Sequence, residues 1–153
     1  MNYNILLMVV IVLLSSCGGL IQNKAVQGLN LPAFSGKSLK NKTVKFPSNL
    51  EKENTILIVG YKQRSQFDID RWLIGLEMAK VKIPVYEIPV LSPWFPKFLQ
   101  KRIDRGMQSG IPQNLWTNVI TVYKDANKIK DFLGNEKPNN ARVLLVNKKG
   151  KII

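Results

Sequence analysis

The chain has 153 residues, with 23 lysines and arginines against 10 aspartates and glutamates, a single cysteine and no histidine. Without histidine there can be no Ser-His or Cys-His nucleophile pair and no histidine-ligated zinc site, and one thiol forms no disulfide within the chain. The apolar share of 45% and charged share of 22% are those of a globular protein, so we expect one compact domain that needs neither a metal nor a cofactor.

The first sixteen residues have the features of an export signal. They contain no charged side chain, and residues 5–14 form an apolar run that is too short to cross a bilayer core of about 30 Å as a helix. The run ends in Leu-Ser-Ser followed by Cys17, which resembles the bacterial lipobox, whose cysteine accepts a diacylglyceryl group. The alternative is an uncleaved anchor with a cysteine there by chance. We expect residues 1–16 to be a removed signal peptide and Cys17 to be the lipidation site.

The net charge of +13 belongs entirely to the chain after Cys17. We expect residues 17–30 to form a lipid-anchored tether that holds the domain at the cell envelope, outside the cytoplasmic membrane. Gly18, in place of aspartate after the lipidated cysteine, resembles lipoproteins that are released to an outer membrane. In this compartment the expected partners of the cations are the bilayer, anionic lipid headgroups or an acidic protein surface, and not nucleic acid.

The first half of the mature chain predicts a hairpin followed by strand, turn and helix. Residues 43–46 indicate a short strand or hairpin after a turn at residues 35–38. Residues 55–61 form an unbroken apolar run, which is typical of a central strand buried on both faces. After a polar turn, apolar side chains at helical spacing predict a helix over residues 65–79.

A second strand and an aromatic, basic helix follow. Residues 84–90 return to extended chain. Ser92 and Pro93 indicate the start of a helix and Gly106 its end. The spacing predicts that Phe98 and its apolar neighbours face the core, while a stripe of cations lies on the opposite face. The cations of this stripe are Lys97, Lys101, Arg102 and Arg105.

The last third of the chain completes an order of β, β, α, β, α, β, α, β, β. Residues 106–114 have the composition of a loop, and residues 119–123 predict a strand rich in β-branched residues. Asp125 is placed to cap a short helix that Gly134 would end. A terminal hairpin is predicted over residues 142–153.

This order of elements looks like a thioredoxin-like fold of the kind that begins with an extra hairpin. Redox members carry Cys-x-x-Cys where residues 62–67 stand in this chain, and a cis-proline where Asn140 or Ala141 stands. Thiol–disulfide exchange is therefore excluded unless a partner brings both thiols. We expect an α/β three-layer sandwich with a mixed central sheet over residues 31–153, lacking the redox cysteine pair and the last helix.

A second resemblance rests on short pieces such as residues 86–90 (Tyr-Glu-Ile-Pro-Val) and residues 105–112 (Arg-Gly-Met-Gln-Ser-Gly-Ile-Pro). These are similar to the mitochondrial ATP synthase assembly factor ten family, over roughly residues 34–153. The family is cysteine-poor and thioredoxin-like, and its members help a membrane-embedded ATP synthase subunit to assemble. The resemblance implies the same fold and an assembly function.

In that family the chain continues through another helix after the position of Ile153. Without this helix, we expect one face of the sheet to be left exposed beside Leu144. Three candidates would complete this face: a client segment, a second copy of the chain, or the N-terminal stretch of residues 29–34 folding back.

Two cationic sets are candidate binding sites. Lys62, Arg64 and Ser65 precede a predicted helix, where free N–H groups and two cations would bind a phosphate, a carboxylate or a lipid headgroup. The alternative there is a solvated loop with a capping box made by Ser65 and Asp68. The four stripe cations would bind anionic membrane or an acidic partner, and otherwise form a solvated helix face.

The acidic residues predict no enzyme. Asp68, Asp70 and Glu87 form no acid–base or metal set, and no general base of near-neutral pKa is apparent. The predicted function is a membrane-anchored, non-redox binding or assembly protein for an envelope membrane-protein client, with an ATP synthase subunit as the client that the resemblance implies. The alternative is an enzyme or binder that acts on a small anionic ligand at the start of the helix over residues 65–79.

Overall fold

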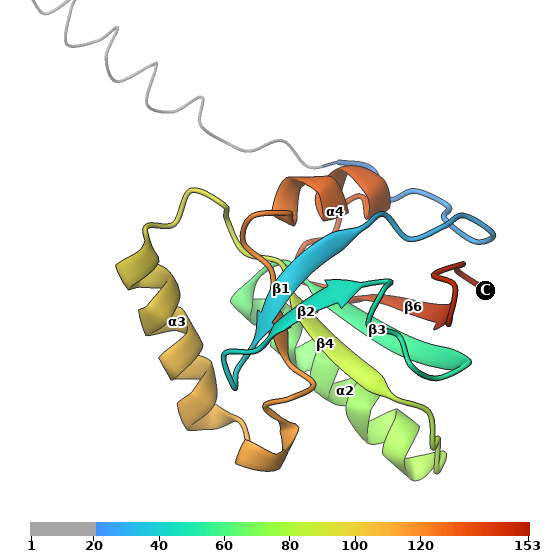
Figure 1. Cartoon of the computed structure of the whole chain (residues 1–153), viewed down its shortest axis with the longest axis horizontal. Helices are drawn as coiled ribbons and strands as arrows, with labels where there is room; N and C mark the ends of the chain where they lie inside the picture. The colour runs from blue at the N-terminus through green and yellow to red at the C-terminus, as the bar shows by residue number, and fades with distance from the viewer. Residues whose placement is uncertain (1–20) are drawn as a thin grey trace, which may run out of the picture.

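A computed structural model describes residues 21–153 (Figure 1), so the expected signal peptide and Cys17 lie outside the described residues. Within that range the chain forms strands, α-helices and two short 3-10 helices in an alternating order. The elements are β1 (Phe34–Ser38), β2 (Thr43–Phe46), β3 (Asn54–Gly60), η1 (Gln63–Ser65), α2 (Gln66–Met78), β4 (Val85–Pro89), α3 (Lys97–Gly110), η2 (Gln113–Leu115), β5 (Ile120–Thr121), α4 (Ala126–Leu133) and β6 (Arg142–Asn147).

The strands form two hydrogen-bonded groups that meet at a seam. One group is antiparallel, in the order β2-β1-β5. The other has the order β4-β3-β6, with β3 parallel to β4 and antiparallel to β6. Parallel bridges from Glu87 to Val119 and from Val90 to Val122 join β4 to the β5 segment. The predicted mixed sheet is confirmed.

Strand β3 lies at the centre of the sheet, and all but its first residue are buried. Its side chains alternate between two hydrophobic clusters, as a strand requires. Ile58 belongs to the same cluster as Ile69 of α2, whereas Leu57 belongs to the larger cluster with Leu133 of α4. Figure 1 shows α2 behind the sheet, so helices cover both faces and the predicted three layers are confirmed.

The N-terminal hairpin is confirmed, but the predicted turn at residues 35–38 is wrong. These residues lie in β1, and the chain turns at residues 39–42 instead. A Cβ atom built on Gly36 would lie 2.6 Å from Cγ2 of Ile120. Glycine therefore stands here because β1 and β5 approach closely, and not because the chain bends.

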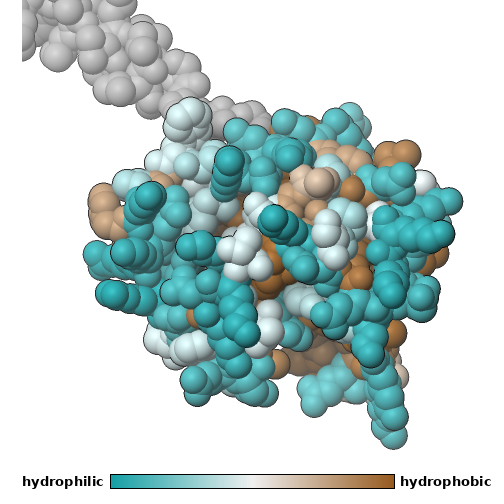
Figure 2. Space-filling model, in the orientation of Figure 1, coloured by the Kyte–Doolittle hydropathy of each residue, from teal (hydrophilic) through white to brown (hydrophobic). Residues whose placement is uncertain are grey.

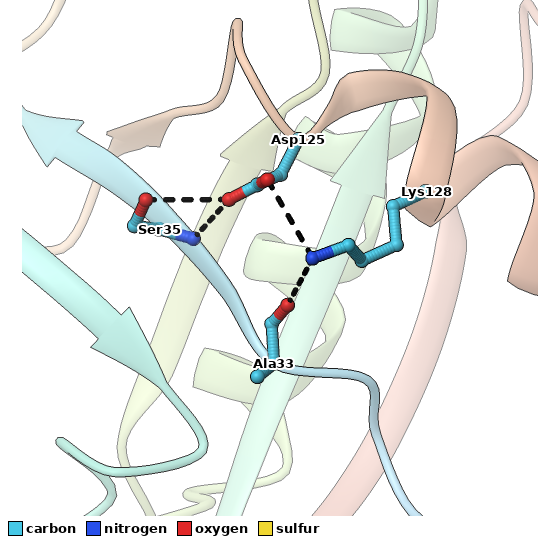
Figure 3. A network of polar contacts seen from close by, with 4 residues as sticks. All are labelled: Ala33, Ser35, Asp125 and Lys128. Carbon is cyan, nitrogen blue, oxygen red and sulfur yellow. Dashed lines mark hydrogen bonds and ion pairs between the residues drawn. The ribbon is translucent and has the colours of Figure 1, made fainter.

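Asp125 ties β1 to α4 and does not cap α4, which corrects the prediction from sequence. Its carboxylate accepts hydrogen bonds from the Ser35 N–H at 2.8 Å and the Ser35 hydroxyl at 3.2 Å (Figure 3). Lys128 lies 3.6 Å from this carboxylate and donates to the Ala33 carbonyl at 2.9 Å. Burial raises the pKa of Asp125, but the Ser35 hydrogen bonds and the charge of Lys128 outweigh it and lower the pKa overall.

The expected tether packs on the domain from residue 21 onward. The Lys24 N–H donates to the Leu133 carbonyl at 3.0 Å, at the end of α4. The Leu31 N–H donates to the Gly150 carbonyl at 2.7 Å, in the turn of the terminal hairpin. Residues 21–33 therefore form an ordered strap between α4 and the C-terminal hairpin.

This strap covers the sheet face beside Leu144. Leu144 is buried in the larger cluster together with Val26 and Leu31 of the strap. The third of the three expected candidates, the N-terminal stretch, is therefore the one found at this face. On the other face of the same hairpin, Leu145 and Ile153 are exposed, so the open side is opposite to the predicted one.

Helix α3 starts later and lies differently than predicted. Pro96 disfavours helical backbone at the residue before it, Phe95. The helix therefore begins after Pro96 and not at Ser92. The helix also continues for four residues past Gly106, which was expected to end it. Phe98, expected in the core, is 74% exposed, and no residue of α3 is buried.

Candidate functional site

A cleft of about 630 Å³ lies where the chain leaves the carboxyl ends of β3 and β4. The turn after β3 forms one wall, and Phe95, which precedes α3, contributes to another. Lys130 of α4 and Asn139 of the loop before β6 also line it. Three of the lining side chains are cations, and none of the described lining residues is acidic. The cations are Lys62, Arg64 and Lys130.

Ser65 builds the turn and does not serve as a cap or a binding group. It is buried, and its hydroxyl donates to the Lys62 carbonyl at 2.6 Å. A Cβ atom on Gly60 would lie 2.6 Å from the Ser65 oxygen, so the strand end is packed tightly against this turn. The predicted capping box is wrong, because Asp68 accepts the Ala141 N–H at 2.9 Å instead.

Tyr61 is a lining residue that sequence reasoning missed. It is 8% exposed, and its hydroxyl has no hydrogen-bond partner within residues 21–153. Burial raises its pKa, and the nearby charge of Arg142 lowers it by less. A buried hydroxyl left without a partner costs about 1–3 kcal/mol. The hydroxyl oxygen itself is buried, so Tyr61 contributes to the wall of the cleft without presenting its hydroxyl to an occupant.

The structure does not bring the two predicted cationic sets together. Lys62 and Arg64 line the cleft, where they join Lys130, which the sequence gave no reason to place there. The four stripe cations are exposed on α3, and none of them lines the cleft. These are Lys97, Lys101, Arg102 and Arg105.

Glu87 corrects the expectation that no group has a near-neutral pKa. This carboxyl group is 7% exposed on β4, and burial raises its pKa to about 7. A hydrogen bond from Gln66 lowers the pKa in part, and the charge of Asp70 raises it. Glu87 does not line the cleft, so it acts on stability rather than at this site.

The described residues limit the chemistry of the site. Within residues 21–153, no group of three His, Cys, Asp or Glu side chains could hold a metal ion. No helix over the same residues is long and apolar enough to cross a membrane. The cleft itself offers charge attraction from three cations.

No protein-family model matches the chain, and no curated protein matches it. The pneumococcal exposed lipoprotein thioredoxin Etrx1 from Streptococcus pneumoniae is similar in structure at 14% identity, with 80% of this chain and 86% of that chain covered and a TM-score of 0.52. BsSco, a member of the Sco family of cytochrome c oxidase assembly proteins, is similar at 14% identity, with 86% and 84% covered and a TM-score of 0.54. The thioredoxin domain of a thiol-disulfide oxidoreductase from Bacteroides vulgatus is similar at 18% identity, with 85% and 87% covered and a TM-score of 0.50.

The chain therefore has a thioredoxin-like fold, as predicted. The matching structures show this fold alone, and they do not show the narrower resemblance to the ATP synthase assembly factor family. They also correct the expectation that the protein is no enzyme, because two of these three are named as a thioredoxin or a thiol-disulfide oxidoreductase. At the position of the redox cysteines, this chain has Lys-Gln-Arg-Ser-Gln-Phe over residues 62–67.

Proposed function

We propose that this protein is a lipid-anchored, thioredoxin-fold binding protein of the bacterial cell envelope, which holds a membrane-protein client through an anionic group bound in the cleft. One observation carries the proposal. Where redox members of the fold have thiols, this cleft is lined by the cations Lys62, Arg64 and Lys130 and by no acidic residue among the described ones.

The chemistry of these groups favours a carboxylate or phosphate as the bound group. Guanidinium and ammonium groups form short, charge-assisted hydrogen bonds with such oxygens. Arg64 supplies the planar guanidinium that best matches a carboxylate or phosphate. An acidic loop of a client would present this group.

Two likenesses support an assembly role. The sequence resembles a family that assembles an ATP synthase subunit, and BsSco belongs to a family named for the assembly of cytochrome c oxidase. An ATP synthase subunit is therefore the first client to test if the lipoprotein stays in the cytoplasmic membrane. If it resides in the outer membrane, as Gly18 favours, the client is instead a protein of that membrane.

A second candidate is an enzyme or binder that acts on a small anionic ligand. The cleft volume of about 630 Å³ lies within the range of about 300–1,000 Å³ that small-molecule sites occupy. In this case the same three cations would bind a free carboxylate or phosphate compound.

The cleft can be tested directly with the domain of residues 21–153, which contains both hydrophobic clusters. We expect inorganic phosphate and a hexaglutamate peptide to shift the amide NMR signals of Tyr61 and Arg64. Replacing Lys62 and Arg64 with glutamine should weaken this binding at least about tenfold, because each change removes a charge-assisted hydrogen bond. The matched control is Lys148→Gln with Lys149→Gln, which removes two exposed cations outside the cleft. Equal binding by both double variants would refute the cleft as an anion site.

A photo-crosslinking amino acid at Gln63, which lines the cleft and is exposed, separates the two candidates in envelope membranes. We expect a crosslinked membrane protein that disappears in the Lys62 and Arg64 double variant. If no protein is captured while phosphate still binds the isolated domain, the second candidate replaces the first.

Lipidation makes a separate prediction. Cys17→Ser should leave an unprocessed precursor that incorporates no labelled palmitate, because serine has no thiol to accept the diacylglyceryl group. Ser15→Ala keeps a small residue before the cysteine and should mature normally. If the Cys17→Ser variant were processed normally and retained in the membrane, Cys17 would not be the residue that carries the lipid.

A further inference from the structure

The outer face of α3 combines exposed aromatic rings with cations. Phe98 is 74% exposed, and Trp94, just before the helix, is 86% exposed. Residues three and four positions apart are neighbours on a helix surface, so Phe98 lies beside Lys101 and Arg102. Lys97, Lys101 and Arg105 form a row at four-residue spacing. The phenyl ring of Phe98 is therefore flanked by cations on the exposed face of the helix.

Helix α3 faces the domain with its half-buried side, which includes Leu99, Ile103 and Met107. Two polar contacts hold one edge of the helix, next to the basic row: the Tyr123 hydroxyl donates to the Asp104 carboxylate at 3.0 Å, and the Gln108 side chain donates to the Leu39 carbonyl at 2.7 Å. Phe98 and the four cations are exposed, so their face points away from the domain, and Figure 1 shows α3 at the edge of the molecule, apart from the sheet.

The exposure of these rings needs an explanation. Figure 2 shows hydrophilic side chains over most of the visible face of the molecule. Helix α2 also exposes large apolar side chains, among them Phe67 at 71%, but on α3 the exposed ring stands among four cations. Trp116, in contrast, is half-buried and its indole donates to the Ile111 carbonyl at 2.8 Å. No such bond from the Trp94 indole is present among the described residues. A bulky ring left in water among cations is typical of a surface that meets lipid headgroups.

We propose that the outer face of α3 docks on an anionic lipid surface, with Trp94 and Phe98 in the headgroup region and the neighbouring cations on lipid phosphates. The net charge of +13 adds long-range attraction to the same surface. This membrane contact uses residues outside the cleft, so it is independent of the anion bound there.

The dimensions of α3 favour lipid over an acidic protein. Fourteen residues make a helix about 21 Å long and about 10 Å across. One exposed side of it offers far less than the roughly 800 Å² that each partner contributes to a stable protein interface. A lipid surface requires no complementary shape and accepts a single amphipathic helix.

The test measures partitioning of the domain of residues 21–153 to phosphatidylcholine vesicles with and without phosphatidylglycerol. We expect binding only with phosphatidylglycerol, together with a blue shift of tryptophan emission that is lost in Trp94→Phe. Replacing Lys97, Lys101 and Arg105 with glutamine should weaken partitioning on the order of 100-fold at low salt, at roughly fivefold for each cation. The matched control replaces three cations of the terminal hairpin, at the opposite edge of the molecule in Figure 1. These are Lys148, Lys149 and Lys151.

The aromatic contribution has its own matched pair. Phe98→Ala should weaken partitioning roughly tenfold, because the ring leaves water on binding. Met78→Ala removes a side chain of similar exposure, 78%, from the far end of α2 and should change nothing. Equal partitioning of the stripe and hairpin variants, or of these two alanine variants, would overturn the proposal. Retention on immobilised polyglutamate without any binding to phosphatidylglycerol would overturn it in favour of an acidic protein.

Discussion

The free energy of unfolding should fall by about 3 kcal/mol between pH 4 and pH 8 through the ionisation of Glu87 alone. Burial raises the pKa of this group from its ordinary value of 4.5 to about 7, and each unit of difference between folded and unfolded chain is worth about 1.4 kcal/mol. Because the folded-state pKa is the higher one, the stabilisation is complete below pH 4.5 and is lost as the pH rises through 7. Urea unfolding at a series of pH values measures this fall.

Glu87→Gln should flatten that profile and make the domain more stable than the parent at pH 8. Glutamine keeps the shape of the protonated acid and has no charge to bury beside Asp70. The control Glu77→Gln changes an exposed carboxylate on α2 and should leave the fall in place. An unchanged pH profile in Glu87→Gln would show that the carboxyl group reaches solvent in the folded chain.

The second large effect is expected at Gly134, where α4 ends. Its φ of +76° lies in the left-handed region, and an added Cβ atom would collide with the Gln22 carbonyl oxygen and the Asn23 Cα of the strap. Backbone strain of about 1–2 kcal/mol and overpacking of about 1–3 kcal/mol together predict a loss of roughly 2–5 kcal/mol in Gly134→Ala. Chemical denaturation measures the loss, and hydrogen exchange should rise first at Lys24, which bonds to the same end of α4.

Gly75→Ala is the matched control for Gly134→Ala. Gly75 lies within α2, and nothing stands within 4 Å of an added Cβ atom. Alanine should therefore stabilise the domain by about 1 kcal/mol through its helix propensity. If both substitutions had the same small effect, residues 22 and 23 would not pack against the end of α4.

The order of elements could be predicted because the strands carry a strong local signal. The apolar run that became β3 is too short for a buried helix and lies between polar turns, and only a central strand fits it. The same local reasoning failed for the helix caps. Ser65 and Asp125 have the right residue types, but the Lys62 carbonyl and the Ser35 amide offered them better partners.

The third cation of the cleft could not be predicted from spacing, whereas the position of Phe98 could have been. Phe98 stands three and four residues before Lys101 and Arg102, so spacing alone places it among the cations, and the prediction of a buried Phe98 overlooked this. Lys130 reaches the cleft only because α4 packs beside β3, 70 residues earlier in the sequence. Tyr61 carried one usable signal, a polar hydroxyl at the end of an apolar run.

The strap has a consequence for where a client can be held. Ile21 and Asn135 exchange hydrogen bonds of 2.8 and 2.9 Å, and Asn135 follows α4, whose Lys130 lines the cleft. Cys17 stands four residues before Ile21, which spans at most about 14 Å even when fully extended. A lipid on Cys17 would therefore keep Ile21, and with it the end of the domain beside α4, within about 14 Å of the headgroups. So short a link would favour clients whose anionic group lies close to the membrane over those that present it far above.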